Sequence, residues 1–168
     1  MSHVDEFGLG SGRELQANFG AVGPARNSAL GPDGNFCQWR LPSVESAIPQ
    51  IRRVMRAFLD SAELSADESE DLVLAVCEAA TNAVEHAQHP EVPFFDVSAE
   101  IGRGVVTVDI RDHGRWLEPT PSRFRGRGLA MMSALADTTV TAGTHGTMVT
   151  IRKHGTGIQA RATEGWAS

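Results

Sequence analysis

The chain has 168 residues, of which 41% are hydrophobic and 21% charged, values typical of one soluble globular domain with a sizeable core. Its net charge of −6 disfavours nonspecific binding to nucleic acid, and we expect no direct nucleic-acid partner. No apolar run is long enough to span a bilayer and the glycine-rich N-terminus does not resemble a signal peptide, so we expect a cytoplasmic protein without membrane contact.

The first predicted elements follow a glycine-rich beginning. Residues 1–34 contain seven glycines and two prolines without hydrophobic periodicity, which predicts a flexible N-terminal arm, although such an arm could also dock a partner. Residues 36–41 alternate apolar and polar side chains, as a half-buried strand does. From 44 to 59 the apolar residues follow helical spacing, and the arginines between them are either a solvated face or a contact for an acidic partner.

Residues 65–87 predict a long helix, because they are rich in alanine, leucine and valine and contain neither glycine nor proline. The segment begins with the serine–glutamate spacing of a capping box. Within it, Glu78, Asn82 and His86 follow at intervals of four residues, so they line one stripe of the helix surface. This stripe is either an ordinary solvated face or the polar part of a binding site.

The surroundings of the stripe bear on this choice. Small apolar residues flank it and the helix contains no lysine or arginine, which predicts that the helix is largely buried. A buried carboxylate and a buried amide need polar partners. Oxygen ligands of this kind suit a metal ion with its waters, or a phosphate chain that is held through the metal. Glu78 and Asn82 are therefore candidates for a metal–phosphate site.

The second half of the chain predicts two hairpins and one more helix. Residues 93–101 and 104–111 have strand patterns and are joined by a short glycine-containing link, as in an antiparallel hairpin. A loop rich in proline and arginine leads to residues 126–136, a glycine-rich start followed by a short apolar helix. Residues 138–142 and 147–152 make a last hairpin.

Together these elements predict one folded domain, residues 35–154, followed by a flexible C-terminal tail, residues 155–168. The order of elements is strand, helix, helix, two strands, helix and two strands, without an internal repeat. Helices that cover one face of a mixed, mostly antiparallel sheet make an α+β fold, a two-layer α/β sandwich.

Two glycines, Gly126 and Gly128, stand at the start of the short helix and are followed by Leu129. Glycines at such a place let backbone N–H groups approach a phosphate, and the helix N-terminus adds a favourable dipole. Arg125 and Arg127 add positive charge beside them. A tight turn explains the two glycines equally well, and the sequence has neither a Walker loop nor a dinucleotide fingerprint.

Asp112 and Gly114 stand where the strand 104–111 ends. An aspartate at this place can shape a turn by accepting backbone hydrogen bonds. It can equally accept a hydrogen bond from an exocyclic amine such as that of adenine, with Gly114 leaving room for the base. The motif alone does not decide between these two readings.

The order of the motifs is more specific than any one of them. Along the chain follow Glu78-xxx-Asn82, Asp112-x-Gly114, Gly126-x-Gly128-Leu129 and Gly146-Thr147. In this order the chain resembles the GHKL (histidine-kinase-like) ATPase superfamily over roughly residues 37–153, and within it the anti-sigma-factor serine/threonine kinases. The resemblance implies the Bergerat-type ATP-binding fold.

The resemblance also implies a site for ATP and Mg²⁺. Glu78 would be the general base and Asn82 would hold the metal. Asp112 and Gly114 would recognise the adenine, in part through a water shared with Thr147. The lid and helix start that would wrap and neutralise the phosphates comprise Arg125, Gly126, Arg127, Gly128 and Leu129.

The function that the resemblance implies is an ATP-dependent protein serine/threonine kinase. Such a kinase phosphorylates an anti-anti-sigma protein and sequesters a sigma factor by partner switching, and it is commonly a homodimer. The stretch between Asp112 and Gly128 is shorter than the usual lid of the family, so the alternative is a weak or inactive ATP-binding adaptor that regulates a partner through binding alone. A histidine kinase is disfavoured, because the glycine-rich arm does not supply a helical hairpin with a phosphoacceptor histidine.

Overall fold

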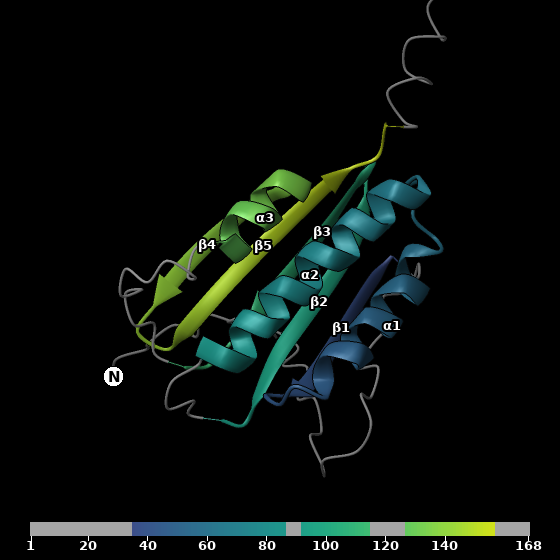
Figure 1. The fold of residues 1–168 in the computed structure, drawn as a ribbon. Coiled ribbons are helices and arrows are strands. Elements are labelled where there is room, and N and C mark those ends of the chain that lie inside the picture. Colours follow the sequence, from purple (N-terminus) through teal and green to yellow (C-terminus); the bar gives the residue numbers. More distant parts are fainter. Residues whose placement is uncertain (1–34, 87–91, 115–126, 157–168) are drawn as a thin grey trace, which may run out of the picture.

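The computed structural model describes residues 35–86, 92–114 and 127–156, which form three helices and five strands (Figure 1). In chain order these are β1 (Phe36–Pro42), α1 (Ala47–Leu59), α2 (Ala66–His86), β2 (Phe94–Gly102), β3 (Val105–Arg111), α3 (Arg127–Leu135), β4 (Asp137–Gly143) and β5 (Gly146–His154). This is the predicted order. Among the described helices, none combines the length and the apolar character needed to cross a membrane.

Parts of the prediction fall on residues that the structure does not describe. The expected arm 1–34 and the expected tail beyond residue 156 lie outside the described residues. Arg125 and Gly126 of the expected lid lie outside them as well. The division of the chain into arm, domain and tail therefore stays a prediction.

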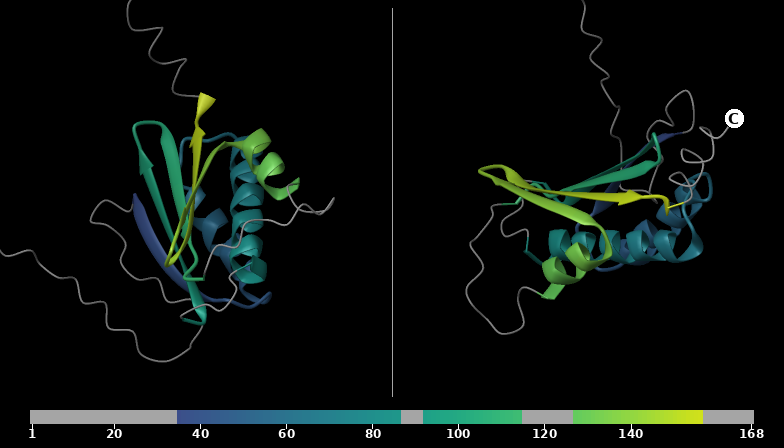
Figure 2. Two further views of the ribbon diagram at one scale, coloured as in Figure 1. Left: turned by 90° about the vertical axis from the view of Figure 1, so that its left-hand side faces the viewer. Right: turned by 90° about the horizontal axis from the view of Figure 1, so that it is seen from above.

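The described strands form one open sheet in the order β1-β2-β3-β5-β4, in which each pair of neighbours is antiparallel. The three helices lie together on one face of this sheet (Figure 2). The predicted α+β two-layer sandwich is thus confirmed. We call the other face of the sheet, which these helices leave uncovered, the open face.

The core lies between the helices and the sheet, and strand alternation selects the residues that enter it. In β2, Phe95, Val97 and Ala99 are buried, whereas the residues between them face the open side. The helix α2 presents Ala79 and Ala80 to the core, and these small side chains let it lie close to the sheet. Each large apolar side chain that is fully buried contributes about 1.5–3 kcal/mol.

The start of α2 is capped as its sequence predicts. Ser65 Oγ accepts a hydrogen bond from the Glu68 backbone N–H at 3.2 Å, and Glu68 Oε2 accepts one from the Ser65 N–H at 2.7 Å. The other oxygen of Glu68 accepts the backbone N–H of Thr156 at 2.9 Å. These hydrogen bonds lower the pKa of Glu68 from 4.5 to about 2, and the bond from the Ser65 backbone N–H has the largest effect.

The start of α1 differs from the expectation. A helix was expected from residue 44, but α1 begins at Ala47. Val44 is 47% exposed and belongs to a preceding turn, in which its N–H donates to Pro42 O at 2.8 Å. Pro49 is compatible with the later start, because it then occupies the first turn of the helix, where no backbone donor is required.

Both ends of the described domain lie beside the turn that joins β2 to β3. Asn35 accepts the Ile101 N–H at 2.7 Å, and Gly155 donates to Gly104 O at 3.0 Å. The other end of β3, at Arg111, lies six residues further along the strand, or about 20 Å away.

Candidate functional site

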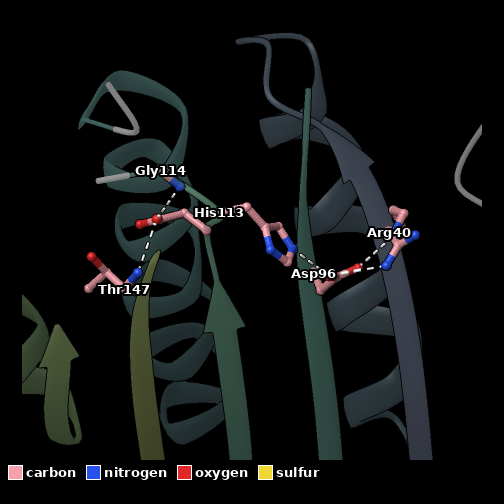
Figure 3. A network of polar contacts seen from close by, with 6 residues as sticks. Arg40, Asp96, His113, Gly114 and Thr147 are labelled. Carbon is pink, nitrogen blue, oxygen red and sulfur yellow. Dashed lines mark hydrogen bonds and ion pairs between the residues drawn. The ribbon is translucent and has the colours of Figure 1, made fainter. Parts of the chain in front are cut away.

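Asp112 is the centre of a hydrogen-bonded cluster at the end of β3. Its backbone N–H donates to Thr147 O at 3.0 Å, which extends the pairing with β5 by one residue. Its Oδ1 accepts the N–H of Gly114 at 3.0 Å and the N–H of Thr147 at 3.1 Å (Figure 3). The structure therefore brings together Asp112, Gly114 and Thr147, which the sequence places in two separate motifs.

The second carboxylate oxygen of Asp112 is available to a ligand. Oδ2 has no hydrogen-bond partner within the described part of the chain. In that part, each buried side-chain nitrogen or oxygen has a partner, so the unpaired Oδ2 is accessible. An oriented carboxylate oxygen with open lone pairs suits an N–H donor of a ligand.

Gly146 lies against Asp112 and requires glycine for two reasons. Its φ of +137° is a conformation that side-chain-bearing residues rarely adopt, and a Cβ at this position would overlap the carbonyl oxygen of Asp112. Gly146 belongs to the last of the ordered sequence motifs but is not among the predicted site residues. Its place directly before Thr147 was the signal that could have added it to the site.

Glu78 and Gly128 form a second cluster, in which α3 begins against α2. A Cβ at Gly128 would overlap Glu78 Oε1, so only glycine permits this approach. Glu78 and Asn82 are half-buried, and neither side chain has a hydrogen-bond partner among the described residues. Asn82 lies one turn beyond Glu78 on the same stripe of α2. The side chain of His86 lies outside what the structure describes.

The two clusters lie toward the same end of the molecule. The C-terminal end of α2 and the start of β5 lie at one end in Figure 1, and α2 packs on both β3 and β5. Arg127 and Leu129, in the first turn of α3, are exposed, Leu129 by 46%. This end of the fold therefore combines an oriented carboxylate, side-chain oxygens on α2 that have no partner among the described residues, and a glycine at a helix start.

These oxygens fit a metal that arrives together with phosphate. In the described ranges, no three His, Cys, Asp or Glu side chains are grouped as a closed metal site would require. Mg²⁺ usually keeps several waters and takes one or two protein oxygens in addition to phosphate oxygens. The Asn82 amide oxygen matches that smaller protein contribution.

An open cleft of about 530 Å³ lies at the opposite end of the sheet. It is bordered by Ser61, Glu63 and the β2–β3 turn, and none of its lining residues belongs to the predicted site. The chemistry of the motifs therefore favours the Asp112 end, where polar groups converge, over this cleft.

The family comparison covers most of the folded region. A family model described as a histidine kinase-like ATPase domain matches residues 41–153. This range includes every element from α1 to β4 and nearly all of β5.

Two curated relatives match parts of the chain. An anti-sigma F factor of Clostridium botulinum (strain Alaska E43 / Type E3) is 34% identical over 71 residues, which are 42% of this chain and 50% of that protein. A serine-protein kinase RsbW of Staphylococcus epidermidis is 32% identical over 82 residues, which are 48% of this chain and 52% of that protein. The chain thus spans about half the length of these relatives.

Solved structures share the fold. A crystal structure of the RsbU and RsbW domains of a Mycobacterium tuberculosis protein has a TM-score of 0.57 at 25% identity, over 70% of this chain and 32% of that one. A blue-light activated histidine kinase of Erythrobacter litoralis has a TM-score of 0.51 at 19% identity, over 73% of this chain and 44% of that one. The second likeness concerns the fold alone.

Proposed function

The chain belongs to the family of histidine kinase-like ATPase domains, and from this premise we propose that it binds ATP with Mg²⁺ at the end of the fold where Asp112 lies. The observation that carries the proposal is the orientation of the Asp112 carboxylate. Oδ1 is fixed by two backbone N–H groups while Oδ2 stays open, as an acceptor for the exocyclic amine of adenine must be. Gly114 adds no side chain that would fill the place of the base.

The phosphates would lie between α2 and the start of α3. Asn82 would hold the Mg²⁺, and the metal would neutralise part of the phosphate charge. At Gly128 the absence of a Cβ leaves room for the Glu78 carboxylate beside the first turn of α3, whose backbone N–H groups would bind the phosphates. Arg127, exposed in the same turn, adds positive charge.

The reaction we propose is transfer of the γ-phosphoryl group to a serine or threonine of an anti-anti-sigma protein. Glu78 would accept the proton of the attacking hydroxyl, whose oxygen bonds to the γ-phosphorus as the bond to the leaving oxygen of ADP breaks. The half-buried carboxylate of Glu78, which has no hydrogen-bond partner in the described part of the chain, supports this role. The names of the relatives, an anti-sigma F factor and a serine-protein kinase, support the choice of substrate.

When it is not transferring phosphate, the chain would bind a sigma factor in the cytoplasm and so keep it inactive. It would do so as a monomer or a homodimer. Binding of the anti-anti-sigma protein would release the sigma factor. The competing function is an adaptor that binds ATP and a partner without transferring phosphate. Glu78 favours the kinase, because an adaptor does not require an available base beside the phosphate site.

The first test is calorimetric titration of ATP with and without Mg²⁺, on the wild type and on Asn82→Ala. We expect Mg²⁺-dependent binding in the wild type and its loss in the variant, because the amide oxygen that would hold the metal is removed. The matched control is Asn35→Ala, an exposed asparagine at the opposite end of the sheet, which should bind like the wild type. Unchanged Mg²⁺-dependent affinity in Asn82→Ala would contradict the site assignment, and no ATP binding in the wild type would contradict the function.

A further inference from the structure

A polar network on the open face of the sheet reaches the segment that holds Asp112. The side chain of the next residue, His113, places Nε2 2.8 Å from Asp96 Oδ2 on β2. Asp96 is bonded in turn to Arg40 on β1, with Arg40 Nε 2.7 Å from Oδ1 and a terminal nitrogen 3.3 Å from Oδ2. Figure 3 shows the chain of contacts from Arg40 through Asp96 to His113.

The strand register explains why these residues meet. Asp96 pairs with Arg40 on one side and with Arg111 on the other. His113 lies two residues beyond Arg111 and thus on the same face, where it is opposite Phe94 and diagonal to Asp96. The rings of Phe94 and His113 contact edge to face, with centroids 5.2 Å apart.

The network is more constrained than an exposed ion pair. The side chains of Arg40, Asp96 and His113 are only 30%, 32% and 20% exposed, so their contacts are partly shielded from water. The Arg40 guanidinium lies 3.9 Å from the centroid of the Phe94 ring, which limits its orientations. Since the Asp96 carboxylate only accepts hydrogen bonds, Nε2 of His113 is the donor.

We propose that Asp96 is a positioning residue for nucleotide recognition, which acts through His113 on Asp112. The inference rests on the proposed nucleotide site. Consecutive side chains at a strand end point to opposite faces, so Asp112 faces the helix side while His113 fixes the same backbone from the open face. Among the described contacts, the segment 112–114 is held to β5 by Asp112 and to β2 by His113. Without the second attachment, Oδ2 of Asp112 is less well placed to accept the adenine amine.

The readout is the affinity that depends on this amine. Calorimetry with Mg²⁺ compares ATP with purine riboside triphosphate, an analogue that lacks the 6-amino group. The wild type should prefer ATP. Asp96→Ala should weaken ATP binding by about tenfold and leave the analogue nearly unaffected, because small displacements of an orienting group are costly only where that group is used. A general loss of folded protein would reduce the binding of ATP and of the analogue equally.

The companion variants test the route of the effect. His113→Ala should behave like Asp96→Ala, and the double variant should be no worse than either single one, because both remove the same attachment. His113→Gln carries an amide donor near the place of Nε2 and should restore the preference for ATP. The matched control is Asp109→Ala, which removes an open-face carboxylate on β3 bonded to Thr150 and should retain the wild-type preference.

The outcomes separate this inference from the proposed function. A wild type that binds no ATP contradicts both. A wild type that prefers ATP, together with an unchanged preference in Asp96→Ala or equal losses for both ligands, overturns the positioning role and leaves the proposed function intact. If Asp96→Ala does not fold, the comparison of His113→Ala with His113→Gln decides the question in the same way.

Discussion

At the scale of single residues, Glu78 is the side chain whose replacement should separate nucleotide binding from phosphoryl transfer. Glu78→Gln keeps the size of the side chain but removes the carboxylate proposed as the base, so ATP affinity should stay within about threefold of the wild type while transfer falls by about 10²-fold or more. The assay is transfer of labelled γ-phosphate to the anti-anti-sigma proteins of the same organism, beside calorimetry with ATP.

The control for this variant is Glu70→Gln, the same change on the same helix, at a glutamate paired with Arg56 and far from Gly128. It should transfer phosphate at the wild-type rate. Full activity in Glu78→Gln would exclude the role of Glu78 as the base, and transfer lost together with ATP binding would point to a role in binding instead.

The sequence was sufficient to propose site residues that lie close together along one helix. It was insufficient for residues that meet only through the register of neighbouring strands. Glu78 and Asn82 could be proposed from the sequence because a helix converts a spacing of four into one stripe. Asp96 and His113 could not, because strand alternation gives the face of a residue but not its neighbour on the next strand. The pairing of Asp96 with Arg111 supplies that neighbour only in the folded protein.

At the scale of elements, the close approach of α3 to α2 at Gly128 should control the position of Glu78. In Gly128→Ala the new methyl group overlaps the end of the Glu78 side chain, which can rotate away, so we expect a loss of stability of no more than about 1 kcal/mol. Phosphoryl transfer should nevertheless fall by about tenfold or more, because the displaced carboxylate no longer reaches the hydroxyl. Thermal unfolding and the transfer assay measure the two effects.

Gly102→Ala is the matched control, because a Cβ at Gly102 meets no atom within 4 Å and the residue lies at the opposite end of the sheet. It should retain both stability and transfer. Wild-type transfer in Gly128→Ala would contradict the prediction that the close approach at Gly128 controls the working position of Glu78.

The elements themselves were predicted in their order, and the start of α1 shows the limit of periodicity. Val44 continues the apolar spacing of the helix, so the pattern alone extends the helix to it. The backbone bond from Val44 N–H to Pro42 O instead closes a turn before the helix begins. Local hydrogen bonding of this kind competes with helix formation, and a hydrophobic pattern does not predict it.

At the scale of the whole molecule, Glu68 connects the start of α2 to the chain beyond β5 through Thr156. Because its pKa is lowered to about 2 in the folded protein, its stabilisation is present above pH 4.5 and is lost as the pH falls from about 4.5 to about 2. Glu68→Gln should therefore be less stable than the wild type at pH 7, by no more than about 1 kcal/mol, because glutamine can keep part of the capping box but not the charge. The difference should close toward pH 2.

Urea unfolding of the wild type and of Glu68→Gln at several pH values measures this difference. The control is Glu100→Gln, at an exposed glutamate on β2 whose side chain has no hydrogen bond in the described ranges, and it should differ little from the wild type throughout. A difference for Glu68→Gln that stays constant between pH 7 and pH 2 would contradict an effect of its ionised carboxylate.

The position of the two ends of the described domain has a practical consequence for biosensor design. Residues 35 and 156 lie near the β2–β3 turn, about 20 Å along β3 from Asp112. A protein immobilised on a sensor chip through either residue would present the end with the proposed nucleotide site away from the surface. Attachment through the β4–β5 turn, which ends beside Gly146 and Asp112, would instead bury that end beneath the molecule.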